Sequence, residues 1–210
     1  MVANYGCAAG ELAACVTAAG MADYTQLTKL ELTGPAAALA AVLGAVTGAT
    51  LAPGGALLAR SAWWCAASCE RLIVLSEPWS IPSLHDRLAQ GLVQESGVQL
   101  RDRSSDWCAI AVLGRRASEV LAALGVYGPS RDPRQTPPFT AAALGEAPTL
   151  WLLESDRRAV ALVSRREAEP AWRAIERAGR PRAIRYVGQE AAARYALLDR
   201  RAAVAAAAFA

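Results

Sequence analysis

The feature that most constrains the fold is an internal repeat: several short motifs occur twice along the chain, in the same order. Residues 110–114 (Ile-Ala-Val-Leu-Gly) match residues 30–34 (Leu-Glu-Leu-Thr-Gly), and an alanine-rich stretch follows each run. Farther along, residues 160–164 match residues 72–76, and each run precedes a helical pattern that ends at a glycine. Two matches in the same order indicate one supersecondary unit used twice. The alternative is a chance echo in an alanine-rich chain.

Within the first copy, the residue pattern predicts the order β-α-β-β-α-β. Apolar alternation predicts a strand over 27–33, and Gly34-Pro35 then opens a helix that ends at Gly44. The remaining expected elements are strands at 57–64, 72–75 and 98–101, the last at a sheet edge, and a helix over 80–93. The predicted fold class is α+β, with two tandem ferredoxin-like halves.

The expected halves are residues 1–105, with an N-terminal helix, and residues 106–210, with a C-terminal helix, forming one compact unit. A chain of 210 residues with 54% apolar residues can bury a core of this size. A net charge of +3 with 20% charged residues does not make a nucleic-acid-binding footprint.

The sequence gives no sign of a membrane or metal protein. The longest apolar stretch near the start, residues 13–21, is too short to span a bilayer. Residues 1–20 contain no basic residue, so a secretory signal is not expected. The five cysteines lack paired spacing and His85 is the only histidine, which argues against disulfides and against a zinc site. These observations favour a cytoplasmic protein.

Several stretches together resemble one family. They are residues 10–11 (Gly-Glu), 19–25 (Ala-Gly-Met-Ala-Asp-Tyr-Thr), 29–36 (Lys-Leu-Glu-Leu-Thr-Gly-Pro-Ala), 70–75 (Glu-Arg-Leu-Ile-Val-Leu), 108–114, and 172–198 with its Tyr-Val-Gly-Gln-Glu-Ala run. In this order they resemble glycine-cleavage T-proteins, the folate-dependent aminomethyltransferases. The resemblance implies a disc of ferredoxin-like halves with a central pocket for tetrahydrofolate. The short form resembles sarcosine oxidase gamma subunits, which lack the C-terminal β-barrel of T-proteins.

The chain departs from the T-protein pattern at two carboxylates. T-proteins carry an aspartate, near the carbon being transferred, in the helix after the Leu-Ile-Val-Leu strand; here that position falls at Ser83 or Leu84. The family's Gly-Glu-Asp-Gly-x-Glu segment, whose carboxylate holds the pterin, corresponds to residues 154–161, where the pterin glutamate is missing. Asp86 or Glu77 would have to replace the missing aspartate.

The remaining candidate residues each have a structural alternative. His85 with Asp86 forms an acid–base pair in the catalytic interpretation, with Glu77 nearby; the alternative is a surface or packing histidine. Trp79, at a strand-to-helix turn, could stack on a heterocyclic ligand or plug the core. Asp23 and Tyr24, in the best-matched motif, would line the same cavity, although Asp23 also suits a turn or cap.

Four arginines flank the strand predicted near residues 159–164. Arg157, Arg158, Arg165 and Arg166 could hold a carboxylate or phosphate. The favoured interpretation is a solvated sheet edge protected by charge.

Two classes of function follow. The favoured one is an aminomethyltransferase-like protein that acts on a small one-carbon or amine substrate or on a folate-like ligand. In this interpretation the family motifs of the protein are degenerate. The alternative is a non-catalytic structural subunit of a heteromeric flavin oxidase, with a protein partner or a homo-oligomer. The missing carboxylates favour the subunit, and the aromatic and acidic residues around Trp79 favour the transferase.

Overall fold

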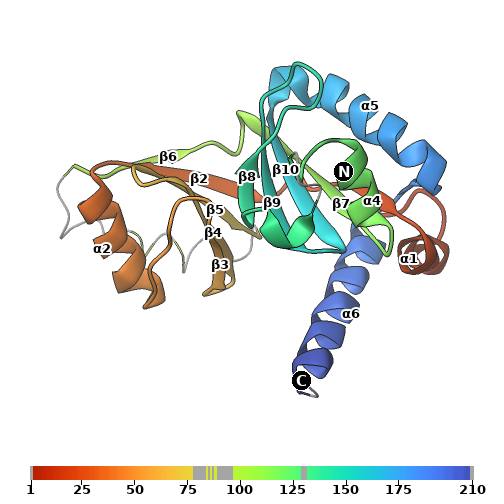
Figure 1. Ribbon diagram of the computed structural model, residues 1–210, viewed down its shortest axis with the longest axis horizontal. Coiled ribbons are helices and arrows are strands. Elements are labelled where there is room, and N and C mark those ends of the chain that lie inside the picture. The colour runs from red at the N-terminus through yellow and green to blue at the C-terminus, as the bar shows by residue number, and fades with distance from the viewer. Residues whose placement is uncertain are drawn as a thin grey trace. The chain divides into compact units, whose positions relative to one another are not determined.

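The computed structural model describes residues 2–77, 84, 86, 88, 97–128 and 132–208, with side chains through Arg201 (Figure 1). Trp79, His85 and most of the helix expected over 80–93 lie outside the described residues. Within that segment Leu84, Asp86 and Leu88 are helical.

The chain divides into two compact units that do not follow a single cut in the sequence. Unit 1 comprises Met1–Tyr24, Ala109–Thr136 and Ala141–Ala210, and unit 2 comprises Thr25–Cys108 and Pro137–Thr140. The expected ranges 1–105 and 106–210 therefore differ from these units. The division after Cys108 is close to the expected boundary, but the first 24 residues belong with the C-terminal part of the chain.

Unit 2 is built on a five-stranded sheet in the order β3-β4-β5-β2-β6. Its elements are β2 (Thr28–Thr33), α2 (Ala36–Thr47), β3 (Ala56–Ala59), β4 (Ala62–Ser68), β5 (Arg71–Ser76) and β6 (Gln99–Asp102). The core on one face of this sheet joins Leu30 and Leu32 of β2 to Leu39 and Val42 of α2 and to Trp64 of β4. Burial of these large apolar side chains is the main force that holds α2 on the sheet.

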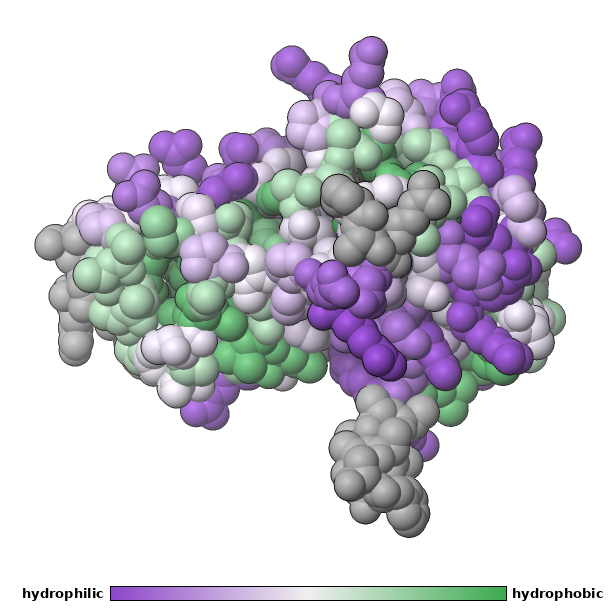
Figure 2. All heavy atoms as spheres, viewed as in Figure 1, coloured by the Kyte–Doolittle hydropathy of each residue, from purple (hydrophilic) through white to green (hydrophobic). Residues whose placement is uncertain are grey.

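The helix α2 runs farther than expected, past Gly44 to Thr47. Gly48 follows in the left-handed region with φ 74° and donates its backbone N–H to the carbonyl of Gly44. A glycine adopts this conformation without a Cβ clash, so Gly48 rather than Gly44 ends the helix. Figure 2 shows the α2 region largely in hydrophobic colours, in keeping with a helix that carries no charged residue.

The single strand expected over 57–64 is instead a hairpin. β3 and β4 pair antiparallel with Ala59 opposite Ala62, and Arg60 and Ser61 form the two-residue turn. Both turn residues have positive φ, 54° and 61°. Neither residue is a typical left-handed turn former, which explains why the sequence pattern did not reveal the turn.

Unit 1 is built on a six-stranded sheet in the order β11-β1-β7-β10-β9-β8. Its strands are β1 (Gly20–Asp23), β7 (Trp107–Leu113), β8 (Phe139–Ala141), β9 (Thr149–Ser155), β10 (Arg158–Ser164) and β11 (Arg185–Tyr186). The helices are α1 (Ala8–Thr17), α4 (Ala117–Ala123), α5 (Ala168–Gly179) and α6 (Gln189–Ala208), with short 3-10 turns at Pro133–Gln135, Arg165–Glu167 and Arg180–Arg182. The N-terminal strand β1 lies between β7 and β11, antiparallel to β7 and parallel to β11.

One carboxylate joins the two ends of the chain within unit 1. Glu11 of α1 is 8% exposed and accepts backbone hydrogen bonds from Tyr5 (2.5 Å), Gly6 (2.8 Å) and Gly188 (2.7 Å). Burial by itself would raise the pKa of Glu11, but the three N–H donors outweigh it and hold the pKa below the ordinary value. Glu11 therefore fixes the N-terminal segment to the residues that precede α6.

The two sheets confirm an α+β architecture, and the element order is similar in the two units. In unit 2 the order is β2-α2-β4-β5, the helical residues Leu84, Asp86 and Leu88, then β6; in unit 1 it is β7-α4-β9-β10-α5-β11. The hairpin strand β3 and the strand β8 are additions at the edges of their sheets. None of the helices in the described part of the chain is both long and apolar enough to cross a membrane.

Candidate functional site

The strand β2 places two charged side chains on the sheet face opposite α2. Leu30 and Leu32 point into the core against α2. Because successive side chains of a strand alternate, Lys29 and Glu31 point to the other face. Both are buried all the same, Lys29 at 0% and Glu31 at 7% exposure. Buried charges need partners, so each of the two indicates a specific local arrangement.

Lys29 is held by the backbone around it. Its Nζ donates to the carbonyl oxygens of Thr25 (2.7 Å) and Leu27 (2.8 Å). Its own backbone N–H donates to Ser104 Oγ at 3.0 Å, and its carbonyl accepts from Arg103 N at 2.8 Å. Lys29 thus stabilises the turn that enters β2 and the end of the β2–β6 pair.

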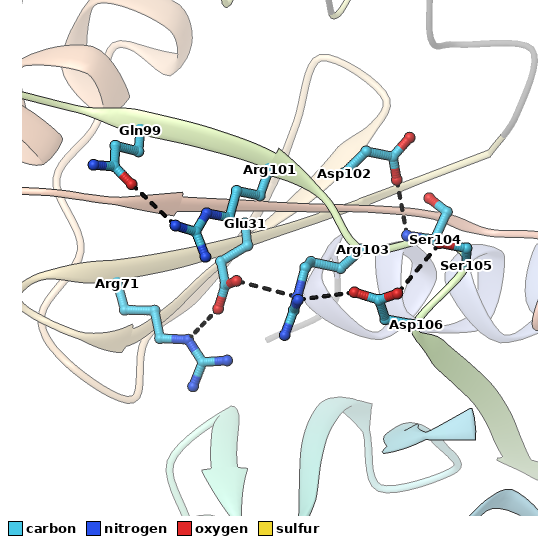
Figure 3. Close-up of polar contacts among 9 residues, drawn as sticks. All are labelled: Glu31, Arg71, Gln99, Arg101, Asp102, Arg103, Ser104, Ser105 and Asp106. Atoms are coloured by element: carbon cyan, nitrogen blue, oxygen red, sulfur yellow. Dashed lines mark hydrogen bonds and ion pairs between the residues drawn. The ribbon is translucent and has the colours of Figure 1, made fainter. Parts of the chain in front are cut away.

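Glu31 lies between two arginines, one on each carboxylate oxygen (Figure 3). Arg71 Nε is 2.7 Å from Oε1, and Arg103 Nε is 3.2 Å from Oε2. Arg71 opens β5 and Arg103 directly follows β6, so the strands on both sides of β2 each supply one cation. The low exposure of Glu31 makes these charge-assisted contacts stronger than surface ion pairs.

Trp107 and Asp106 complete this group. The guanidinium carbons of Arg71 and Arg103 lie 5.7 Å and 5.2 Å from the centre of the Trp107 ring. Asp106 Oδ2 accepts from Arg103 Nη1 at 2.8 Å. We call Glu31, Arg71, Arg103, Asp106 and Trp107 the arginine–tryptophan cluster. The aromatic ring and the carboxylates together fix the orientation of both guanidinium groups.

A third arginine lies beside the cluster. Arg101 of β6 is directly opposite Glu31 of β2 in the strand register, so the two residues share a sheet face. Its Nη2 donates to Gln99 Oε1 at 3.3 Å, and the side chain is exposed (Figure 3). The sheet face therefore carries more positive than negative charge around Glu31.

Two of the residues singled out from the sequence lie in unit 1. Asp23 ends β1 and is half-buried. Tyr24 follows it, is 8% exposed, and donates its backbone N–H to the carbonyl of Ala109 at 2.9 Å. Their placement next to β7 shows how β1 is anchored, and their role as ligand-binding residues stays a prediction.

The proposed catalytic residues lie in unit 2. Glu77 directly follows β5 and is half-buried, whereas Asp86 is helical and exposed. Their supposed companions His85 and Trp79 lie outside the described residues. Glu77 and Asp86 thus belong to unit 2 and Asp23 and Tyr24 to unit 1, and the catalytic and folate-binding assignments remain predictions.

The interpretation of residues 157–166 as a charged sheet edge is wrong for Arg158. The strand β10 lies inside the sheet between β7 and β9, and Arg158 is only 4% exposed. Arg158 Nη2 lies 3.0 Å from Glu154 Oε2, across the turn from β9 to β10. Periodicity alone could not show this, because the burial of Arg158 depends on strands from elsewhere in the chain.

A metal site and a reactive Cys15 thiol would each make specific demands on the described side chains. Among them there is no group of three histidine, cysteine, aspartate or glutamate residues placed to hold a metal ion. Burial, with a smaller effect from Glu11, raises the pKa of the Cys15 thiol to about 12. Cys15 is therefore protonated at neutral pH and is a packing residue rather than a nucleophile.

Sequence reasoning missed the arginine–tryptophan cluster. Its members lie at positions 31, 71, 103, 106 and 107, so only the pairing of β2 with β5 and β6 brings them together. One signal was present: Glu31 stands between two leucines in an apolar strand, where a carboxylate needs cationic partners.

Comparisons with known proteins identify the fold. No protein-family model matches the sequence, and no curated protein matches it. Among solved structures, a chain of the heterotetrameric sarcosine oxidase from Corynebacterium sp. U-96, in complex with pyrrole 2-carboxylate, is similar with a TM-score of 0.64 and 20% identity over 86% of this chain and 94% of that chain. The glycine cleavage system aminomethyltransferase T from Bartonella henselae gives a TM-score of 0.64 and 14% identity over 88% of this chain and 52% of that chain. This chain thus spans about half the length of that aminomethyltransferase. Both matches confirm the resemblance at the level of the fold, which is mixed α+β and consistent with a ferredoxin-like folate-binding fold.

Proposed function

We propose that this chain is a non-catalytic subunit of a larger oxidase assembly, built on the aminomethyltransferase fold from two β-α-β-β-α-β halves. The observation that carries the proposal is the position of the family aspartate, where this chain has Ser83 or Leu84 in place of a carboxylate. Similarity to a chain of a heterotetrameric sarcosine oxidase, with a TM-score of 0.64 over 86% of this chain, supports an oxidase assembly. The similar element order in the two units supports the two halves.

The positions of the candidate catalytic residues also support a subunit. Asp86 is exposed on a helix, and the family aspartate position holds Ser83 or Leu84. A carboxylate that stabilises a cationic transferred carbon works best in a site shielded from water. An exposed Asp86 does not meet this condition.

The test is purification of the tagged full chain from its own organism at native expression level. We expect it to elute in a complex of fixed stoichiometry with an oxidase polypeptide, with flavin absorbance near 450 nm, as measured by light scattering and absorbance. Elution as a single chain with folate-dependent aminomethyl transfer would overturn the proposal.

A second candidate is an aminomethyltransferase-like protein that binds tetrahydrofolate and a small amine. Fold similarity over 88% of the chain to the aminomethyltransferase favours it. In this proposal Asp23, Tyr24 and Trp79 hold the folate, and Glu77, Asp86 and His85 serve the chemistry. Saturable quenching of tryptophan fluorescence by tetrahydrofolate, lost in Trp79→Ala, would support this candidate. Absence of saturable quenching in the wild type would exclude it.

A further inference from the structure

We propose that Arg71, Arg103 and the adjacent Arg101 form a binding site for a small molecule bearing a carboxylate or a phosphate. The site is distinct from the folate-binding residues expected from the sequence and goes beyond the proposed subunit function. It lies on the face of the unit 2 sheet opposite α2.

The first argument is the unused hydrogen-bonding capacity of the two clustered arginines. Glu31 accepts a hydrogen bond from Nε of Arg71 and forms an ion pair with Arg103, whose Nε is 3.2 Å from Oε2, and Asp106 accepts a hydrogen bond from Nη1 of Arg103. Within the described part of the chain, both terminal nitrogens of Arg71 and Nη2 of Arg103 have no hydrogen-bond partner. The Arg71 side chain is 36% exposed and that of Arg103 32%, so these donors are accessible.

The second argument is preorganisation. Glu31 fixes both guanidinium groups from the buried side, and Trp107 lies within cation–π distance of both. An arginine that is already held loses less rotamer freedom when a ligand binds, so more of the interaction free energy appears as affinity. A surface arginine such as Arg173, which is 68% exposed and pairs with the exposed Glu169, lacks this support.

The third argument is charge. Three arginines on this face stand against the carboxylates of Glu31 and Asp106, which leaves an excess positive charge. A guanidinium presents its terminal N–H groups in a planar fork that matches two oxygens of a carboxylate or phosphate. The three arginines therefore favour a ligand that carries an oxyanion, either a carboxylate or a phosphate.

The indole N–H signal of Trp107 offers a direct test by ¹H–¹⁵N NMR, because the chain has only six tryptophans. Trp107→Phe assigns the signal. The full chain is titrated separately with acetate and with inorganic phosphate, at ionic strength held constant with NaCl. We expect a saturable shift of the Trp107 signal; saturation by acetate identifies a carboxylate ligand, and saturation by phosphate alone identifies a phosphate ligand.

Charge-matched variants complete the test. Arg71→Gln should weaken the response at least 10-fold, whereas Arg173→Gln, which removes the same charge from α5, should leave it unchanged. If Arg71→Gln does not fold, Arg71→Lys is used in its place. Arg71→Lys keeps a positive charge beside Glu31 but lacks the planar fork of N–H donors, so it should also weaken binding. A signal that responds to neither anion, or responds equally in Arg71→Lys and wild type, would overturn the site.

Discussion

At the scale of single residues, Glu11 shows how one buried carboxylate stabilises contacts that are far apart in sequence. Glu11→Gln removes the charge that attracts three backbone N–H groups and leaves an amide that accepts less well. We expect the variant to lose about 1–3 kcal/mol of unfolding free energy at pH 7. Urea unfolding followed by circular dichroism measures this loss.

The difference in unfolding free energy between wild type and Glu11→Gln should also depend on pH. Because the pKa of folded Glu11 lies below its ordinary value of 4.5, its contribution is present above pH 4.5 and is lost as the pH falls through the folded pKa. The stability gap between wild type and Glu11→Gln should therefore narrow below pH 4.5. Glu169→Gln, on an exposed side chain, is the control and should change stability by less than about 0.5 kcal/mol. A gap that stays constant down to pH 3 would contradict the prediction.

At the scale of elements, the β3–β4 hairpin turns through two residues in the left-handed region. Side chains other than glycine and asparagine are strained there by about 1 kcal/mol each. Arg60→Asn combined with Ser61→Gly should therefore raise the midpoint of urea unfolding, with a gain of about 1 kcal/mol.

A proline at the same place gives the opposite expectation. Ser61 has φ 61°, whereas a proline ring requires φ near −65°, so Ser61→Pro should destabilise the hairpin. Equal unfolding midpoints for wild type and the Asn-Gly variant would show that the turn is not strained.

The element scale also shows where sequence reasoning succeeded and where it stopped. The strands β2, β5, β7 and β10 and the helix α5 were predicted, because apolar periodicity and flanking glycines are local signals. The strands β1 and β11 were missed, since they are four and two residues long and are defined by their pairing. The same reason applies to the arginine–tryptophan cluster: Glu31 was visible, but its partners depended on strand register.

At the scale of the whole molecule, β1 lies inside a sheet otherwise made by the second half of the chain. Deleting residues 2–24 removes the strand between β7 and β11 and the carboxylate of Glu11. We expect backbone amides of β7 to lose protection from hydrogen exchange, while those of β2 and β5 in unit 2 stay protected.

Deletion of residues 202–210 is the matched control, because it shortens the chain at its other end without removing a strand. Protection in β7 should then be unchanged. Unaltered β7 protection after deletion of residues 2–24 would contradict the structural role assigned to β1.

The position of β1 also has a consequence for synthesis on the ribosome. Residues 20–23 emerge well before one of their two neighbours in the sheet, Arg185–Tyr186. Most of unit 2 is a continuous stretch and can complete its sheet while translation continues. Strand β1 must wait with one edge unpaired until Arg185–Tyr186 has been synthesised, so unit 1 is the part whose folding is exposed to chaperones and to premature association.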